Sequence, residues 1–320
     1  MTSILDRKFF VTNYDIKDPN FIREKPATIM FIGDMHYQPN VDFRVFEQLV
    51  RYAREKKPEI IVFLGDQVET IDFIDNIEYR MMFERIISEL LEIAPIVMIP
   101  GNHELGNFTK ENVTNKEARK KLNVRSIRYF DHLNKLGDVR FLYNAQTRIN
   151  DVNFIGFTPR IEAELELGER ASEYIIEDYL KCGFDLSLTN NNILLTHGPT
   201  ELTNVVDRIP DLLKRVILAL RAHYHGGYLP KALYRVLGDT NVGLFMSPWI
   251  SPFKGIICRG IHDFGNGHLI ASAGYRKYTA DLKVFNLMEK FTANDVEFVT
   301  LSNGPKEVIV EVERPFMLRK

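Results

Sequence analysis

An apolar run, Pro95-Ile96-Val97-Met98-Ile99, leads directly into Pro100-Gly101-Asn102-His103-Glu104. The run has strand length, Pro100 cannot donate to a β-ladder, and Gly101 permits a sharp turn. The polar side chains that follow are therefore expected on a loop at a strand's carboxyl end, where α/β proteins bind ligands. Asn102 offers a neutral oxygen ligand and His103 a proton near neutral pH. Taken alone, a polar turn that carries a histidine explains this stretch equally well.

Apolar runs of strand length alternate with helical periods upstream of this turn. Residues 28–32 and 59–64 predict buried strands, and residues 41–57 and 76–93 predict helices with one apolar face. This β-α-β-α-β order predicts parallel pairing with helices covering the sheet. The aromatic-rich segment 9–16 predicts an opening strand at a sheet edge.

The remaining chain predicts further strands and two helical regions. The strands are expected over 139–143, 152–157, 193–196, 215–220, 269–272, 296–301 and 307–313, and the first two should flank the turn at 150–151. The last two should form a hairpin around Ser302-Asn303-Gly304-Pro305. Helices are expected within 107–137 and 160–181. Because no repeat or linker is visible, residues 1–320 are expected to form a single domain.

Composition excludes several classes of function. The 320 residues are 45% hydrophobic and 26% charged, which is ordinary for a globular protein. A net charge of −2 argues against nucleic acid as a partner. Two cysteines, Cys182 and Cys258, are expected to be packing residues in a reduced compartment. With no membrane-spanning run or signal-peptide pattern, a cytoplasmic location is expected, and peripheral membrane contact stays open.

Ligand-type side chains follow five of the predicted strands. They are Asp34 and His36, Asp66 and Glu69, Asn102 and His103, His197, and His223 and His225. Five of the eight histidines lie in these turns, a concentration that packing does not explain. The mixed oxygen and nitrogen set suits Zn, Mn or Fe better than Ca or Mg. Nine such side chains exceed the needs of one such ion, and seven of them suffice for two ions that share a carboxylate.

These five groups of side chains form five sequence blocks. In their order along the chain, the blocks resemble the pattern of the calcineurin-like metallophosphoesterases: Asp-x-His, Gly-Asp-x-x-Asp, Gly-Asn-His-Glu/Asp, a lone His, and Gly-His-x-His. Glu69 replaces the usual Asp, and Ala222 replaces the usual Gly. The continuation after His225, the opening strand and the segment 269–276 are similar to the YkuE-like phosphodiesterase subgroup. The resemblance implies an α/β fold of four layers, α-β-β-α, with two mixed β-sheets. Its core motifs would span 28–227, and strands within 268–314 would complete the second sheet.

The same resemblance implies a role for each site residue. One metal would be held by Asp34, His36, Asp66 and His225, and a second by Asp66, Asn102, His197 and His223. Asp66 would bridge two divalent ions, Mn, Fe or Zn with Mg also acceptable, which would activate a bridging hydroxide. His103 would protonate the leaving group, and the carboxylate of Glu69 would orient His103.

The expected activity is hydrolysis of a phosphoester, most readily a phosphodiester, in a small-molecule or lipid-linked substrate. One alternative is a catalytically silent scaffold of the same fold, although such loss normally removes a ligand or the acid, and here all are present. A pyrophosphatase or a nuclease would use the same chemistry. The near-neutral charge and the lack of a basic-aromatic stripe weigh against the nuclease. The oligomeric state is left open.

Overall fold

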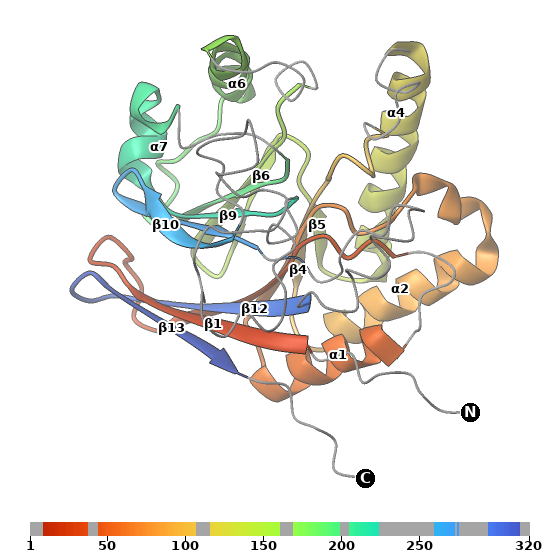
Figure 1. Cartoon of the computed structure of the whole chain (residues 1–320), viewed down its shortest axis with the longest axis horizontal. Helices are drawn as coiled ribbons and strands as arrows, with labels where there is room; N and C mark the ends of the chain where they lie inside the picture. The colour runs from red at the N-terminus through yellow and green to blue at the C-terminus, as the bar shows by residue number, and fades with distance from the viewer. Residues whose placement is uncertain are drawn as a thin grey trace, which may run out of the picture.

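The computed structural model describes residues 9–37, 44–106, 116–160, 169–198, 205–223, 259–272, 274 and 294–313. Two mixed β-sheets face one another, and helices cover their outer faces (Figure 1). The fold is therefore the predicted α/β arrangement of two mixed sheets with flanking helices. Within the described ranges, no helix is both long enough and apolar enough to cross a membrane.

The first sheet has seven strands in the order β13-β1-β12-β2-β3-β4-β5. Their bounds are β1 Phe9–Lys17, β2 Ala27–Ile32, β3 Ile60–Leu64, β4 Ile96–Ile99, β5 Val139–Phe141, β12 Asn294–Ser302 and β13 Glu307–Glu313. Strands β2, β3 and β4 pair in parallel, as the β-α-β-α-β order predicts, and β5 adds to β4 in the same direction. Their carboxyl ends therefore lie at one edge of the sheet.

The second sheet has six strands in the order β10-β11-β9-β8-β7-β6. Their bounds are β6 Ala145–Ile149, β7 Val152–Phe157, β8 Asn192–Thr196, β9 Val216–Arg221, β10 Gly260–Phe264 and β11 Gly267–Ala271. The four inner strands are parallel, and the edge strands β6 and β10 are antiparallel to their neighbours.

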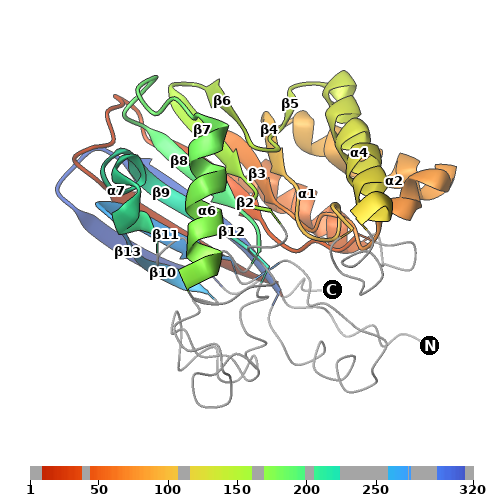
Figure 2. The same ribbon diagram turned by 90° about the horizontal axis from the view of Figure 1, so that it is seen from above.

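Helices cover the outer face of each sheet (Figures 1 and 2). Against the first sheet lie α1 Arg44–Lys56, η1 Ile71–Asp75, α2 Ile77–Leu91, α4 Lys116–His132 and η2 Leu133–Leu136. Against the second lie α6 Glu169–Cys182, η4 Val206–Arg208 and α7 Pro210–Arg215. Asn76 caps α2 by accepting hydrogen bonds from the backbone N–H groups of Glu78 and Tyr79.

The central strands bury both faces, which explains their unbroken apolar sequences. In β3, Ile61 and Phe63 pack toward the helices, whereas Ile60, Val62 and Leu64 pack between the sheets. Alternate residues of a strand point to opposite faces, so one short run contributes to two apolar layers. This double burial fixes the position of the strand ends that carry the polar turns.

Several strand pairings differ from those expected. Strand β1 is not at an edge, because β12 and β13 flank it. The predicted hairpin of β12 and β13 is wrong, since β1 lies between them. Of the C-terminal strands expected to complete the second sheet, β11 does so, but β12 and β13 belong to the first sheet. Alternation of apolar and polar residues identifies a strand but does not show which strand pairs with it. The pairings found here join segments near the two ends of the chain.

The hairpin around residues 150–151 is also built differently. The strand opposite β7 is β6, which is not among the predicted strands, while β5 pairs with β4 in the other sheet. Strand β6 reads Ala-Gln-Thr-Arg-Ile and lies at an edge, so its apolar signal is weak. Asn150 and Asp151 have φ of 48° and 67°, the backbone required by a tight two-residue hairpin turn.

Candidate metal centre

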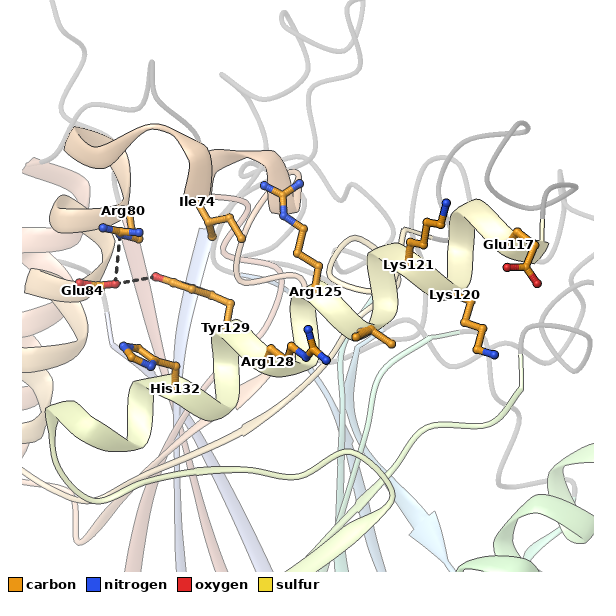
Figure 3. A pocket seen from close by; sticks show the side chains of 11 residues that line it. Ile74, Arg80, Glu84, Glu117, Lys120, Lys121, Arg125, Arg128, Tyr129 and His132 are labelled. Carbon is orange, nitrogen blue, oxygen red and sulfur yellow. Dashed lines mark hydrogen bonds and ion pairs between the residues drawn. The ribbon is translucent and has the colours of Figure 1, made fainter.

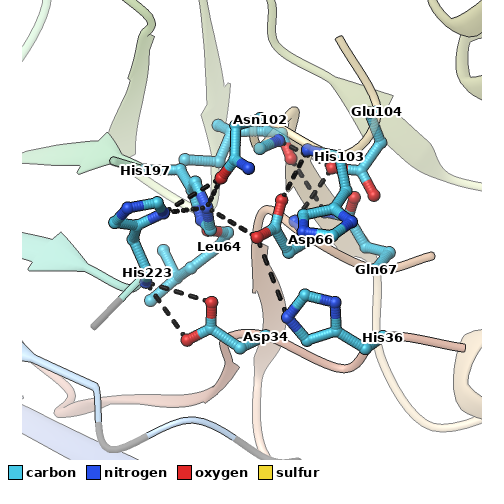
Figure 4. Close-up of polar contacts among 12 residues, drawn as sticks. Asp34, His36, Leu64, Asp66, Gln67, Asn102, His103, Glu104, His197 and His223 are labelled. Carbon is cyan, nitrogen blue, oxygen red and sulfur yellow. Dashed lines mark hydrogen bonds and ion pairs between the residues drawn. The ribbon is translucent and has the colours of Figure 1, made fainter. Parts of the chain in front are cut away.

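The carboxyl ends of five parallel strands meet at one edge of the two sheets (Figure 4). Strands β2, β3 and β4 of the first sheet deliver Asp34, Asp66 and Asn102, and β8 and β9 of the second deliver His197 and His223. His36, His103 and Glu69 follow in the same loops. The structure therefore brings together eight of the nine site residues predicted from the sequence, and His225 lies outside the described residues.

The loops after β2 and β3 run side by side and are joined through their main chains. The N–H of Asp34 donates to the carbonyl oxygen of Gly65 at 3.2 Å, and that of His36 donates to Asp66 at 2.8 Å. Tyr37 forms an isolated β-bridge with Val68. This pairing aligns the first two carboxylates of the site.

Several site residues adopt the left-handed backbone region, which residues other than glycine rarely enter. The φ angles are 53° for Asp34, 44° for His36, 52° for Asp66 and 90° for His223. Each such position costs on the order of 1 kcal/mol, and outside tight turns such strain is concentrated at functional sites. Gly101 is needed for a different reason, because a Cβ at this position would overlap the Asp66 carboxylate. Ala222 is not among the described residues with positive φ, so its backbone tolerates the replacement of glycine.

His197 is oriented so that one ring nitrogen faces three potential ligands. Its Nδ1 lies 2.7 Å from the Leu64 carbonyl oxygen, which can only accept a hydrogen bond. Its Nε2 lies 3.1 Å from Asp66 Oδ2, 3.2 Å from Asn102 Oδ1 and 3.3 Å from His223 Nδ1. In the neutral imidazole the Nε2 lone pair would face the oxygens of Asp66 and Asn102, and a cation at this position, either a proton or a metal ion, would remove that repulsion.

A second group lies on the other side of Asp66. One ligand atom from each of Asp34, His36 and Asp66 lies within 4.8 Å of the others, and Asp66, His197 and His223 meet the same limit. His36 places Nε2 3.8 Å from Asp66 Oδ2 and Nδ1 3.0 Å from Glu69 Oε2. A carboxylate behind the far nitrogen of a histidine is the usual outer-shell support of a metal ligand. The two groups share Asp66, so the residues present fit a pair of divalent cations.

The electrostatics of the site depend on Asp66. Burial would raise the pKa of this carboxyl, but His197 and His103 hold it well below its usual range. Burial lowers the pKa of His197, and Asp66 more than reverses this effect, raising it to about 10. Burial and the neighbouring His197 together lower the pKa of His223 to about 3. Without a metal, the proton of this cluster therefore lies on His197, and metal binding would displace it.

His103 lies next to the metal groups and is held by the main chain. Its backbone N–H donates to Asp66 Oδ1 at 2.9 Å, and its Nδ1 lies 2.7 Å from the carbonyl oxygen of Glu69. The contact differs from the expected one, because the Glu69 carboxylate is 4.0 Å from this nitrogen. Burial lowers the pKa of His103, but Asp66 and the Glu69 carbonyl outweigh burial and raise it above its ordinary value.

Glu104 is a positioning residue whose role the sequence did not specify. It is fully buried, and its Oε2 accepts hydrogen bonds from the backbone N–H groups of Asp66 at 2.8 Å and Gly101 at 2.7 Å. Its Oε1 accepts a third from Val68 at 3.0 Å. The Ser126 hydroxyl donates to its carbonyl oxygen and ties α4 to the loop. Burial and the charge of Asp66 raise the pKa of Glu104 to about 7.

Comparisons with known proteins agree with this geometry. A family model described as calcineurin-like phosphoesterase matches residues 27–227, a range that contains all five blocks. Phosphodiesterase YaeI of Escherichia coli (strain K12) is 31% identical over 87 residues, which are 27% of this chain and 31% of that relative. The chain thus matches about a third of the length of this curated relative.

Two solved structures are also similar. A dimetal phosphatase from Danio rerio is 13% identical, with a TM-score of 0.40 over 80% of this chain and 88% of that chain. GAP50, the anchor in the inner membrane complex of Plasmodium, is 11% identical, with a TM-score of 0.43 over 85% of this chain and 79% of that chain. On the match of the family model to most of its length, the chain belongs to the calcineurin-like phosphoesterase family.

Proposed function

We propose that this protein is a metal-dependent phosphoesterase that hydrolyses a phosphodiester bond. The observation that carries the proposal is the convergence of two ligand groups on Asp66, with His103 beside them. Family membership supports hydrolysis of a phosphoester. The relative with 31% identity is a phosphodiesterase by name, which supports a diester, although the match spans only 31% of that relative.

Each ligand group has a defined set of residues. Asp34, His36 and Asp66 would hold one ion, and the family pattern adds His225 to them. The second ion would be held by Asp66, Asn102, His197 and His223. Manganese, iron or zinc suits this mixed donor set, and magnesium is also acceptable. Bound there, two divalent ions would supply Lewis-acid stabilisation of the phosphoryl oxygens and lower the pKa of a water molecule.

His103 is the proposed general acid. Because a carbonyl oxygen can only accept, the Nδ1 hydrogen of His103 is donated to Glu69, and the second proton of the imidazolium is carried by Nε2. The raised pKa favours this charged form near neutral pH. Protonation of a departing alkoxide by such a group typically contributes about 10²–10⁴-fold in rate.

The proposed substrate is a small-molecule or lipid-linked phosphoester. The near-neutral charge of the chain does not favour nucleic acid. A silent scaffold would be expected to lack a ligand or the acid, and the described part of the site retains its ligands and His103. A cytoplasmic location, expected from the low cysteine content, completes the proposal.

Metal analysis combined with two test esters examines this proposal. The purified protein would be assayed for bound metal and for hydrolysis of bis-p-nitrophenyl phosphate and p-nitrophenyl phosphate, with added Mn²⁺ or with a chelator. We expect about two ions per chain and a chelator-sensitive rate that is higher on the diester. Bound metal without turnover of either ester would favour the scaffold. A chain that binds no metal would overturn the proposal.

A further inference from the structure

Helix α4 carries a strongly basic face that the proposed chemistry does not use. The helix packs Ser126, Tyr129 and Phe130 against the protein, and all three are buried. Lys120, Lys121 and Arg128 are exposed on its outer side. In a chain with a net charge of −2, such a concentration of cations on one helix creates a local positive field.

This face forms one wall of a groove of about 840 Å³ (Figure 3). Five lysines and arginines line the groove against two glutamates. Two of the five cations are neutralised locally, because Arg125 pairs with Asp72 and Asp75, and Arg80 lies 3.8 Å from Glu84. No ion pair between described residues involves Lys120, Lys121 or Arg128. These three cations are therefore available for an anionic partner.

One exposed apolar side chain lines the same groove, and two more lie on α2 within one turn of a residue that lines it. Val124 of α4 is 41% exposed, and Ile77 and Met81, one turn apart on α2, are 53% and 61% exposed. Arg80 of the groove lies in the same turn of α2 as these two residues. Cations beside exposed aliphatic side chains are typical of surfaces that lie in the headgroup region of a bilayer.

We propose that the basic face of α4 (Lys120, Lys121 and Arg128), together with Ile77, Met81 and Val124, docks on an anionic phospholipid bilayer. The cations match the negative headgroups, and the aliphatic side chains gain by leaving water at the acyl boundary. A nucleic acid would gain no affinity from the exposed aliphatic side chains Ile77, Met81 and Val124. A single strand would in addition stack its bases on exposed rings, and the one tyrosine of the groove, Tyr129, is buried with its hydroxyl on Glu84.

Docking would also bear on the candidate metal centre. Helix α4 is tied to the loop of Asn102 and His103, because the Ser126 hydroxyl donates to the carbonyl oxygen of Glu104. A bilayer under α4 would therefore hold this loop close to the membrane surface. The docking proposal stands on the charges and exposed side chains of α2 and α4 and does not require the proposed hydrolysis.

Vesicle sedimentation tests the proposal with the full chain. Vesicles of phosphatidylglycerol mixed with phosphatidylcholine would be compared with vesicles of pure phosphatidylcholine at low and high salt. The test variant is Lys120→Glu/Lys121→Glu/Arg128→Glu, and the control variant Lys25→Glu/Lys214→Glu/Lys306→Glu makes the same charge change on exposed lysines elsewhere. A further variant, Ile77→Ser/Met81→Ser, removes the apolar contribution.

We expect the protein to bind the anionic vesicles and not the neutral ones, with binding that weakens as salt rises. Each surface cation typically contributes about five-fold in membrane affinity, so the test variant should bind at least about 100-fold more weakly. The control variant should lose far less, and the serine variant should weaken binding while its salt dependence persists. Circular dichroism of each variant would establish that it is folded.

Three results would overturn the proposal: no binding to anionic vesicles, equal binding to both kinds of vesicle, or equal losses in the test and control variants. Tighter binding to an oligonucleotide than to the vesicles would assign the face to a different polyanion. Hydrolysis of a soluble ester, measured on the same preparations, separates the two proposals. A protein that hydrolyses the soluble ester but does not bind the vesicles would refute the docking proposal alone.

Discussion

His103 and Glu69 meet through the main chain of Glu69. The His103 Nδ1 lies 2.7 Å from the Glu69 carbonyl oxygen, whereas the nearest Glu69 carboxylate oxygen is 4.0 Å away. That carboxylate is nearer to His36, with its Oε2 3.0 Å from His36 Nδ1. Glu69 therefore supports two imidazoles with two different groups, and a change of its side chain should separate the two effects.

We expect Glu69→Ala to weaken metal binding more than it impairs the general acid. Loss of an outer-shell partner of a metal ligand typically costs about 10–100-fold in metal affinity. The carbonyl oxygen stays, so the ratio of rates on esters with good and poor leaving groups should change little at saturating metal. Metal titration and kcat on two diesters would measure both effects, with Glu69→Gln as the milder control that keeps an acceptor for His36. A collapse of the rate on poor leaving groups alone would refute the assignment.

His103→Gln should keep the metal ions and lose rate selectively. Removal of the acid should cost about 10²–10⁴-fold on an alkyl diester, whose departing alkoxide needs a proton. On bis-p-nitrophenyl phosphate the loss should be much smaller, because p-nitrophenolate leaves without protonation. Equal losses on both substrates, with metal content unchanged, would count against the acid role.

Asp66→Asn should lose metal as well as activity. Asp66 is common to both ligand groups, and an amide in its place removes the negative charge that both groups share. We expect elemental analysis to find fewer than the wild-type number of ions and no measurable turnover. The matched control is Asp72→Asn, an exposed carboxylate of η1 that pairs with Arg125 at 3.0 Å. Full metal occupancy in Asp66→Asn would mean that Asp66 is not shared.

The convergence of the candidate metal ligands could be predicted from the sequence because each part of the site is local. Each polar turn follows a run that is buried on both faces, as Ile60 to Leu64 show, and such runs reveal the strand and its end without further information. Parallel pairing then brings the strand ends to one edge. Asp66, Asn102 and His197 thus meet although more than a hundred residues separate the first from the last.

The pairings of β1 and the role of Glu104 could not be predicted for the opposite reason. Strand β1 pairs with segments nearly three hundred residues away, and its alternation fits an edge or an interior position equally well. In the sequence alone, Glu104 cannot be distinguished from any other acidic residue of a loop. Only the folded chain shows that its side chain is enclosed and accepts hydrogen bonds from two loops. The division of Glu69 between two histidines depends on side-chain placement in the same way.

His268 should make stability depend on pH. It is buried in β11, and burial with the nearby Lys306 lowers the pKa of its imidazole. Below about pH 6.5 the unfolded chain therefore binds a proton that the folded chain resists, and the free energy of unfolding falls as pH decreases, by at most about 1.4 kcal/mol per pH unit. Urea unfolding of metal-free protein at pH 7 and pH 5.5 would measure this fall.

In His268→Gln the fall in stability between these two pH values should be smaller than in the wild type. His132→Gln is the control, because it removes an exposed histidine of α4. Parallel pH dependences in wild type and His268→Gln would contradict the expectation, since they would show that His268 does not resist protonation in the folded chain.

Glu104→Ala should destabilise the fold around the metal centre without removing a metal ligand. The change leaves three buried backbone N–H groups, those of Asp66, Val68 and Gly101, without their acceptor. At about 1–3 kcal/mol for each group, unfolding of the metal-free protein should become easier by at least about 3 kcal/mol. Glu104→Gln should also destabilise, because its amide nitrogen would face backbone donors. Glu117→Ala, an exposed change on α4, should have little effect. If Glu104→Ala lost activity at unchanged stability, Glu104 would belong to the chemistry rather than to the support of the loops.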